Sequence, residues 1–448
     1  MKRLFLPFLL FLSLLISCST YVDLTEAQSD YYEGNYESSL NYLITNSENI
    51  INKQGSIVYY LDEGIVSHSA EKYDFSINSL ATAEREIEAN FTKSISANIG
   101  SYLLNESVRD YSSSFYEDIY TNIFLSLNYY HVNDIEDAMV EVRRSLDKLQ
   151  LREQELPKLK AELEKQLADN NAKDIDERLH SFDSAFYSSA LSYYLSSLFS
   201  LEYGDYDTFR ISRDKGTTAY KVLNKYYMED YYYAFENLNN VNENSSMINF
   251  LAFSGLSPIK RTQIDKNVLV LESYKDDDGI YHPDYYANVV YTVPLKRGTN
   301  VKTIEVFIDG EKKVLQPFEN LELVAYESLE QTCSSEYIRA YIRAVSREVA
   351  KSVADTASLE EGQTYVETSV LSDIFSLFSV VSEGSGDLRT AHFFPAMSWI
   401  GSFMVNPGEH DIVVKYLSNN NSVLFQERFD DYLVIPGRAN LVEIISAK

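Results

Sequence analysis

The chain has 448 residues, which is enough for two or three domains with complete hydrophobic cores. Its formal net charge of −28 at pH 7 argues against nucleic acid as a partner and against binding flat on an anionic lipid surface, because both would repel it. Only two cysteines, Cys18 and Cys333, are present, so stability must come from packing and not from a disulfide framework.

The first eighteen residues have the pattern of an export signal. Lys2 and Arg3 precede an apolar run, residues 4–16, that is too short to span a bilayer. The run ends in Leu15-Ile16-Ser17-Cys18, which resembles the lipobox of bacterial lipoproteins. The resemblance implies that residues 1–17 are a signal peptide, that cleavage falls before Cys18, and that its sulfur carries diacylglycerol, with palmitate among the acyl chains. The alternative is an ordinary signal peptide in which Cys18 is incidental.

Such a lipid would anchor the chain to the cell envelope, since two or three acyl chains bind a membrane far more firmly than one. Ser19 follows the cysteine where an aspartate would favour the inner membrane. We therefore expect the outer membrane.

Residues 18–250 predict an α-helical domain. Four segments share an aromatic helix end, a tight polar turn and a new helix, and the second follows the first by 37 residues. Each resembles the turn of a tetratricopeptide repeat, which packs helices in pairs. The repeat's tryptophan and closing proline are missing, so we expect an irregular solenoid, with a plain helical bundle as the alternative. The four segments are residues 31–40, 68–77, 127–138 and 198–207.

Two further features belong to this half. Leu149, Leu156 and Leu163 stand at heptad spacing and predict an amphipathic helix, or a helical hairpin, interrupted near Pro157. The 36 tyrosines, many in pairs, are expected to fill gaps between helices with their hydroxyls reaching water. A platform for sugars is the alternative.

Residues 251–448 predict a β-rich, sandwich-like domain, which makes the whole chain α+β. Residues 303–308 alternate in polarity, and Asp309-Gly310 is typical of a type I′ turn, so a hairpin is expected there. Other strands are expected at residues 268–271, 288–293, 411–416, 422–425, 432–435 and 441–445. One helix, near 335–355, interrupts the strands.

That helix carries the best candidate for a binding site. Arg339, Arg343 and Arg347 are spaced four apart on one stripe, where like charges repel unless an anion lies against them. With Arg389 they are candidate ligand-binding residues for a carboxylate or phosphate, since arginine pairs with both in bidentate fashion. The alternative is an internal salt-bridge network with the chain's many acids.

Several segments together resemble a family of uncharacterised bacterial lipoproteins. The resemblance covers most of the mature chain in order and implies a helical-repeat half, a β-rich half and an envelope location, with no established activity. Relatives would carry a tryptophan after Arg389-Thr390, where this chain has Ala391-His392. Besides the lipobox, the segments are residues 116–130, 136–144, 339–344, 387–390, 394–396 and 406–410.

No enzyme motif is evident. The six histidines lack ligand spacing, and Cys333 has no evident base, so we expect no catalytic residues, no metal and no cofactor. The expected function is a lipid-anchored envelope scaffold or adaptor whose helical repeats bind a protein partner. The alternative is a cell-wall glycan-binding protein or enzyme that acts through the β-rich half.

Overall fold

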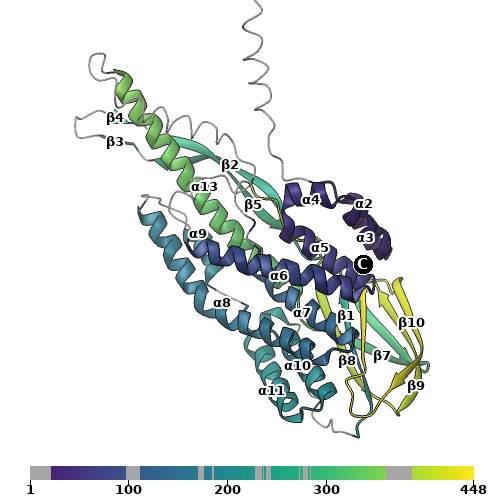
Figure 1. Ribbon diagram of the computed structural model, residues 1–448. Coiled ribbons are helices and arrows are strands. Elements are labelled where there is room, and N and C mark those ends of the chain that lie inside the picture. The colour runs from purple at the N-terminus through teal and green to yellow at the C-terminus, as the bar shows by residue number, and fades with distance from the viewer. Residues whose placement is uncertain are drawn as a thin grey trace, which may run out of the picture.

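A computed structural model shows a helical N-terminal half followed by a β-rich half with an inserted helix, as the sequence predicts (Figure 1). Cys18 and the signal segment lie outside the described residues. In the described part of the chain no helix combines the length and the hydrophobicity that crossing a membrane requires. The structure describes residues 22–96, 111, 113–169, 176–183, 186–227, 235, 237–238, 244–271, 273–275, 281–282, 284–359 and 386–448.

The helices of the first half form antiparallel pairs that pack against one another in chain order. The pairs are α2 with α3, α5 with α6, α7 with α8, and α10 with α11. All four predicted turns lie between the members of these pairs, and Gly34 and Gly204 end helices with the positive φ that favours glycine. The helices are α2 (Thr25–Glu33), α3 (Tyr36–Thr45), α4 (Ser47–Gln54), α5 (Ser56–Ser69), α6 (Tyr73–Ser96), α7 (Phe115–His131), α8 (Ile135–Asp169), α9 (Asp176–Leu179), α10 (Ala190–Tyr203) and α11 (Tyr206–Val222).

Small residues at a constant spacing allow each pair to close. Ser39 in α3 donates a hydrogen bond to the carbonyl of Ala27, twelve residues earlier, at 2.8 Å. Ser76 in α6 donates to the carbonyl of Gly64 at the same spacing, at 2.7 Å. A side chain at Gly64 would collide with Leu80, because a Cβ there would lie 2.4 Å from the Leu80 side chain. Two successive helix pairs therefore repeat one contact, 37 residues apart along the chain.

The predicted interruption at Pro157 is wrong, because α8 is one continuous helix through that residue. A proline inside a helix removes one backbone hydrogen bond and weakens the helix by about 3 kcal/mol. Leu156 and Leu163, on either side of it, are both buried in a common core. The burial of this leucine face offsets the stability that α8 loses at Pro157.

The β-rich half contains one seven-stranded sheet in the order β10-β9-β6-β7-β8-β1-β11. It curls into a nearly closed barrel, so the predicted sandwich-like arrangement is wrong, whereas the β-rich character is confirmed. The short pairing of Gln316 with Ile400 and Pro317 with Trp399 joins β7 to β8 and makes the sheet continuous. Its strands are β1 (Met247–Ser254), β6 (Thr303–Ile308), β7 (Glu311–Pro317), β8 (Met397–Met404), β9 (Gly408–Leu417), β10 (Val423–Val434) and β11 (Leu441–Ser446).

The expected hairpin is confirmed. β6 and β7 pair in antiparallel register, and Asp309 and Gly310 between them have φ of 49° and 83°. Two positive φ values at the turn are the signature of type I′. By contrast, the strands expected at residues 422–425 and 432–435 belong to the single strand β10, which carries register shifts along its pairing with β9.

The inserted helix is longer than expected and belongs to an arm that projects from the barrel. This helix, α13 (Leu321–Leu359), packs against the hairpin of β2 (Ile259–Leu271) and β5 (Tyr285–Leu295) (Figure 1). A small hairpin, β3 (Tyr274–Lys275) with β4 (Tyr281–His282), follows β2. Leucines of α8 and tyrosines of α13 share the core of this arm.

One hydrophobic core joins the helices to the outside of the barrel. Strand β1 is buried along its whole length, because Ile248 and Phe250 face the barrel interior while Leu251 and Phe253 face the helices. Apolar residues therefore face both sides of the strand, which contains the polar Asn249 and lacks the strict alternation of a half-exposed strand.

Tyrosine hydroxyls close the open edge of β11. Tyr130 accepts a hydrogen bond from the backbone N–H of Leu441 at 3.1 Å, and Tyr36 donates to the carbonyl of Ile445 at 2.8 Å. The expectation that tyrosine hydroxyls reach water is wrong for these side chains, because they satisfy strand groups that would otherwise lack partners.

Candidate functional site

An apolar groove lies where the first three helix pairs meet. Its cavity of about 450 Å³ is formed by α3, the turn between α5 and α6, and the turn after α7. Ile44 and Phe75 each leave 42% of their surface exposed and together line the same groove, so they form an exposed apolar patch. We call this site the turn groove; it is lined by Leu40, Asn41, Ile44, Glu71, Lys72, Tyr73, Asp74, Phe75 and Val132.

The rim of the turn groove is mainly acidic. Glu71, in the turn before α6, and Asp74, in its first turn, are exposed. Lys72, the basic residue of the lining, lies 2.8 Å from the Glu37 carboxylate. Apolar side chains surrounded by excess negative charge form a surface that complements an apolar segment flanked by lysine or arginine.

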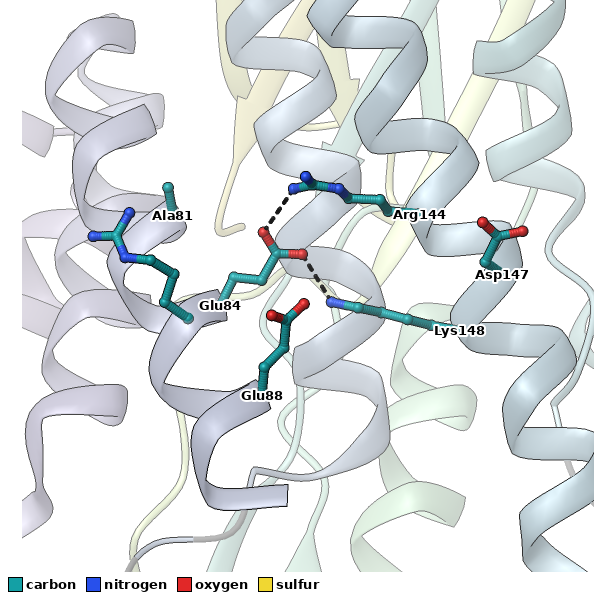
Figure 2. Close-up of a pocket in the computed structure, with 7 residues that line it drawn as sticks. Ala81, Glu84, Glu88, Arg144, Asp147 and Lys148 are labelled. Atoms are coloured by element: carbon teal, nitrogen blue, oxygen red, sulfur yellow. Dashed lines mark hydrogen bonds and ion pairs between the residues drawn. The ribbon is translucent and has the colours of Figure 1, made fainter. Parts of the chain in front are cut away.

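A second depression, between α6 and α8, is lined by charges of both signs. This charged cleft encloses about 430 Å³ and is lined by Ala81, Glu84, Arg85, Glu88, Arg144, Asp147 and Lys148. Figure 2 shows the Glu84 carboxylate of α6 between Arg144 and Lys148 of α8, at 3.3 and 3.0 Å, while Glu88 extends from the same helix toward the same space.

The charges of the cleft are tied to buried groups behind it. Lys148 also contacts Asp118 of α7 at 2.7 Å, and the buried amide of Asn122 donates to Glu84 at 2.7 Å. Burial opposes ionisation of Glu84, yet Lys148 and the Asn122 hydrogen bond lower the pKa of this carboxyl below its ordinary value. The arrangement fastens α6, α7 and α8 through a shared ion-pair network, and we assign it that structural role.

The candidate arginines belong to two segments, the helix α13 and the loop before β8. Arg339 and Arg343 are half-buried on α13, in the arm, and the side chain of Arg347 lies outside the described side chains. Arg389 is buried, and its guanidinium forms two bonds of 2.7 Å with the Asp387 carboxylate. It also lies over the Tyr111 ring, 5.5 Å from the centroid. Arg389 is thus part of an internal ion pair, while a binding role for the stripe on α13 stays a prediction.

Cys333 lies next to a buried ion pair at the base of the arm. Lys260 and Glu336 approach to 2.9 Å with side chains 1% and 5% exposed. Thr292 contacts both the Glu336 carboxylate and the Cys333 sulfur, the latter at 3.3 Å. Burial raises the pKa of the Cys333 thiol to about 12, so the nucleophilic thiolate is disfavoured.

Sequence reasoning missed the turn groove. Recognising it required knowledge of which helices are neighbours.

Across the described ranges, no three His, Cys, Asp or Glu side chains gather closely enough to hold a metal ion. No family model, curated protein or solved structure matches the chain.

Proposed function

We propose that the protein is a lipid-anchored adaptor of the bacterial cell envelope, held in the outer membrane through Cys18, and that its helical repeats bind a protein partner. It would belong to the lipoprotein family that its segments resemble. The observation that carries the proposal is the turn groove, where Ile44 and Phe75 are exposed inside an acidic rim.

The repeat-like packing supports this reading. The contacts from Ser39 to Ala27 and from Ser76 to Gly64 recur at a spacing of 37 residues, and Ser126 and Ala138 occupy the same twelve-residue spacing in the next pair, both buried. Stacked helix pairs with small residues at the crossing are typical of tetratricopeptide-like solenoids, which bind partners along their surfaces.

The chemistry of the groove indicates the kind of partner. An amphipathic helix would place its apolar side chains against Ile44 and Phe75 and its lysines or arginines near Glu71 and Asp74. The overall charge of −28 would speed encounter with a basic segment, because long-range attraction raises association rates.

Binding of designed peptides tests the proposal. The probe is a fluorescent amphipathic helix of leucine and lysine, compared by anisotropy with its leucine–glutamate counterpart, on the mature chain with Cys18→Ser. We expect the basic peptide to bind and the variants Ile44→Asp and Phe75→Asp to weaken it about tenfold or more. The control Leu151→Asp changes an exposed leucine on α8, away from the groove. Equal affinity in Leu151→Asp and Phe75→Asp would refute the groove as the binding site.

A further inference from the structure

A buried carboxylate joins the barrel to the ends of two helices. Glu443 on β11 lies between two imidazoles, with Oε1 2.9 Å from Nε2 of His68 on α5 and Oε2 2.7 Å from Nε2 of His131 on α7. The Glu443 side chain is 4% exposed. We call this contact between the helices and the strands β10 and β11 the seam.

The hydrogen-bond network around His68 requires both ring nitrogens to donate. The Ser76 hydroxyl donates to the carbonyl of Gly64 and therefore accepts from Nδ2 of Asn128, at 2.8 Å. This orients Oδ1 of Asn128 toward Nδ1 of His68, at 2.7 Å. An amide oxygen accepts only, and so does the carboxylate at Nε2, so the ring in this geometry is an imidazolium. Burial opposes that charge, but Glu443 overcomes it and raises the pKa of His68 above its ordinary value.

The seam is continuous with the turn groove. The ring of His131 stacks on Tyr73 with centroids 4.3 Å apart and planes 9° from parallel. Tyr73 lines the groove, and so does Val132, which follows His131 in the chain. Two contacts thus connect the Glu443 carboxylate to the groove wall.

A second carboxyl group at the seam also changes its charge with pH. Burial and, to a smaller extent, the like charge of Glu71 in the turn between α5 and α6 together raise the pKa of Glu427 on β10 to about 7. When Glu427 ionises, two negative charges face each other across the seam. Among the described residues, the titratable and charged groups around the seam are Tyr36 and Glu37 of α3, His68 of α5, Glu71 and Lys72 of the following turn, Tyr73 of α6, Tyr130 and His131 of α7, Tyr416 of β9, Glu427 of β10 and Glu443 of β11.

We propose that the seam is a pH-sensitive latch: with His68 charged and Glu427 neutral it holds the turn between α5 and α6 against the barrel, and rising pH releases this turn. The effect of the latch on partner binding rests on the proposed function, whereas the existence of the latch does not depend on it. Release would move Tyr73, and with it one wall of the turn groove.

The direction of the pH dependence follows from the pKa shift of each group. The raised pKa of His68 means that its stabilising contribution is complete below the ordinary histidine value of 6.5 and is lost as the pH rises through the folded value. Ionised Glu427 is disfavoured, so its cost grows as the pH rises from the ordinary 4.5 toward about 7. Burial opposes ionisation of Glu443, but the two histidines lower its pKa to about 2, so its contribution fails only in strong acid. Both controlling groups therefore favour the closed seam in mild acid.

Hydrogen exchange of the mature chain without any partner tests the latch. After correction for the intrinsic pH dependence of exchange, we expect the protection of residues 68–76 to fall about tenfold between about pH 6 and about pH 8.5. Glu427→Gln should keep part of the protection at the higher pH, and Glu443→Gln should abolish the pH dependence that comes from His68. Glu153→Gln, an exposed change on α8, should behave as the unaltered chain does.

Two results would overturn the latch. One is an unchanged pH profile in Glu427→Gln, a half-buried change that the fold should tolerate. The other comes from nitrogen NMR of the histidine side chains in the unaltered chain, which keeps the test valid even if Glu443→Gln fails to fold. We expect both ring nitrogens of His68 to be protonated at about pH 6, and a neutral ring there contradicts the proposal. Absence of peptide binding, in contrast, would refute the groove and leave these measurements to decide the latch.

Discussion

The Tyr120 hydroxyl of α7 donates a hydrogen bond of 3.0 Å to the carboxylate of Glu319, which precedes α13 and is fully buried. The same carboxylate accepts from the Tyr227 hydroxyl at 3.0 Å, from the Ser189 hydroxyl at 2.9 Å and from the backbone N–H of Leu191 at 3.2 Å. One acidic side chain thus holds α7, the start of α10 and the barrel together.

We expect Glu319→Ala to lower the free energy of unfolding by about 3 kcal/mol or more, because it leaves several buried donors without an acceptor. Glu319→Gln should lose less, since the amide keeps one oxygen acceptor. Urea denaturation monitored by circular dichroism measures both. Glu311→Ala, which removes an exposed carboxylate on β7, should stay within about 0.5 kcal/mol of the unaltered chain. Equal losses in Glu319→Ala and Glu311→Ala would contradict this account of Glu319.

The charged cleft gives a second stability prediction. Lys148→Met removes the cation that Glu84 and Asp118 share, and we expect a loss of about 3 kcal/mol because both acids remain partly buried. Adding Glu84→Gln should recover at least about 1 kcal/mol of that loss, as coupled neighbours do. Arg85→Met, at the rim of the same cleft, is the matched control and should change little. Additive losses in the double variant would show that the pair is not coupled.

This network should also respond to acid. The pKa of Glu84 is lowered, so its stabilising contribution is present above the ordinary value of 4.5 and is lost as the pH falls through the folded value. Lys148→Met should therefore differ least from the unaltered chain in strong acid. A constant difference at every pH would contradict the assignment.

The proposed lipid anchor at Cys18 predicts a change of location without a change of fold. We expect Cys18→Ala to move the chain from the membrane fraction to the soluble fraction of bacterial cells, because the residue that would carry the acyl chains is gone. Labelling with radioactive palmitate should mark the unaltered chain and not the variant. Circular dichroism of the purified variant should match that of the mature chain. Retention of the variant in membranes would show that another contact holds the protein there.

Local signals in the sequence predicted much of the helical half. The turns at Gly34 and Gly204 need a positive φ that glycine supplies, and Asp309-Gly310 specifies its hairpin for the same reason. These features depend on residues that are close in the chain, so a pattern of few residues is sufficient.

Such local patterns do not predict which residues pair when they are far apart in the chain. The parallel pairing of β1 with β11 joins Asn249 to Leu441, two residues that lie far apart in the chain. Likewise, the sequence does not distinguish Glu319 and Glu443 from other acidic residues, because the partners that surround them come from distant helices. The turn groove was missed for the same reason, because Val132 and Ile44 meet only in the packed helices.

Site-specific crosslinking in living bacteria tests whether the turn groove binds a protein partner. A photoreactive residue in place of Asn41, an exposed position in the lining of the turn groove, should yield one dominant protein adduct, whereas the same residue in place of the exposed Gln150 on α8 should not. We expect Phe75→Asp to abolish the adduct and the captured protein to carry a basic amphipathic helix at the crosslinked site. An adduct from position 41 that persists in Phe75→Asp, or the absence of any adduct, would contradict this expectation.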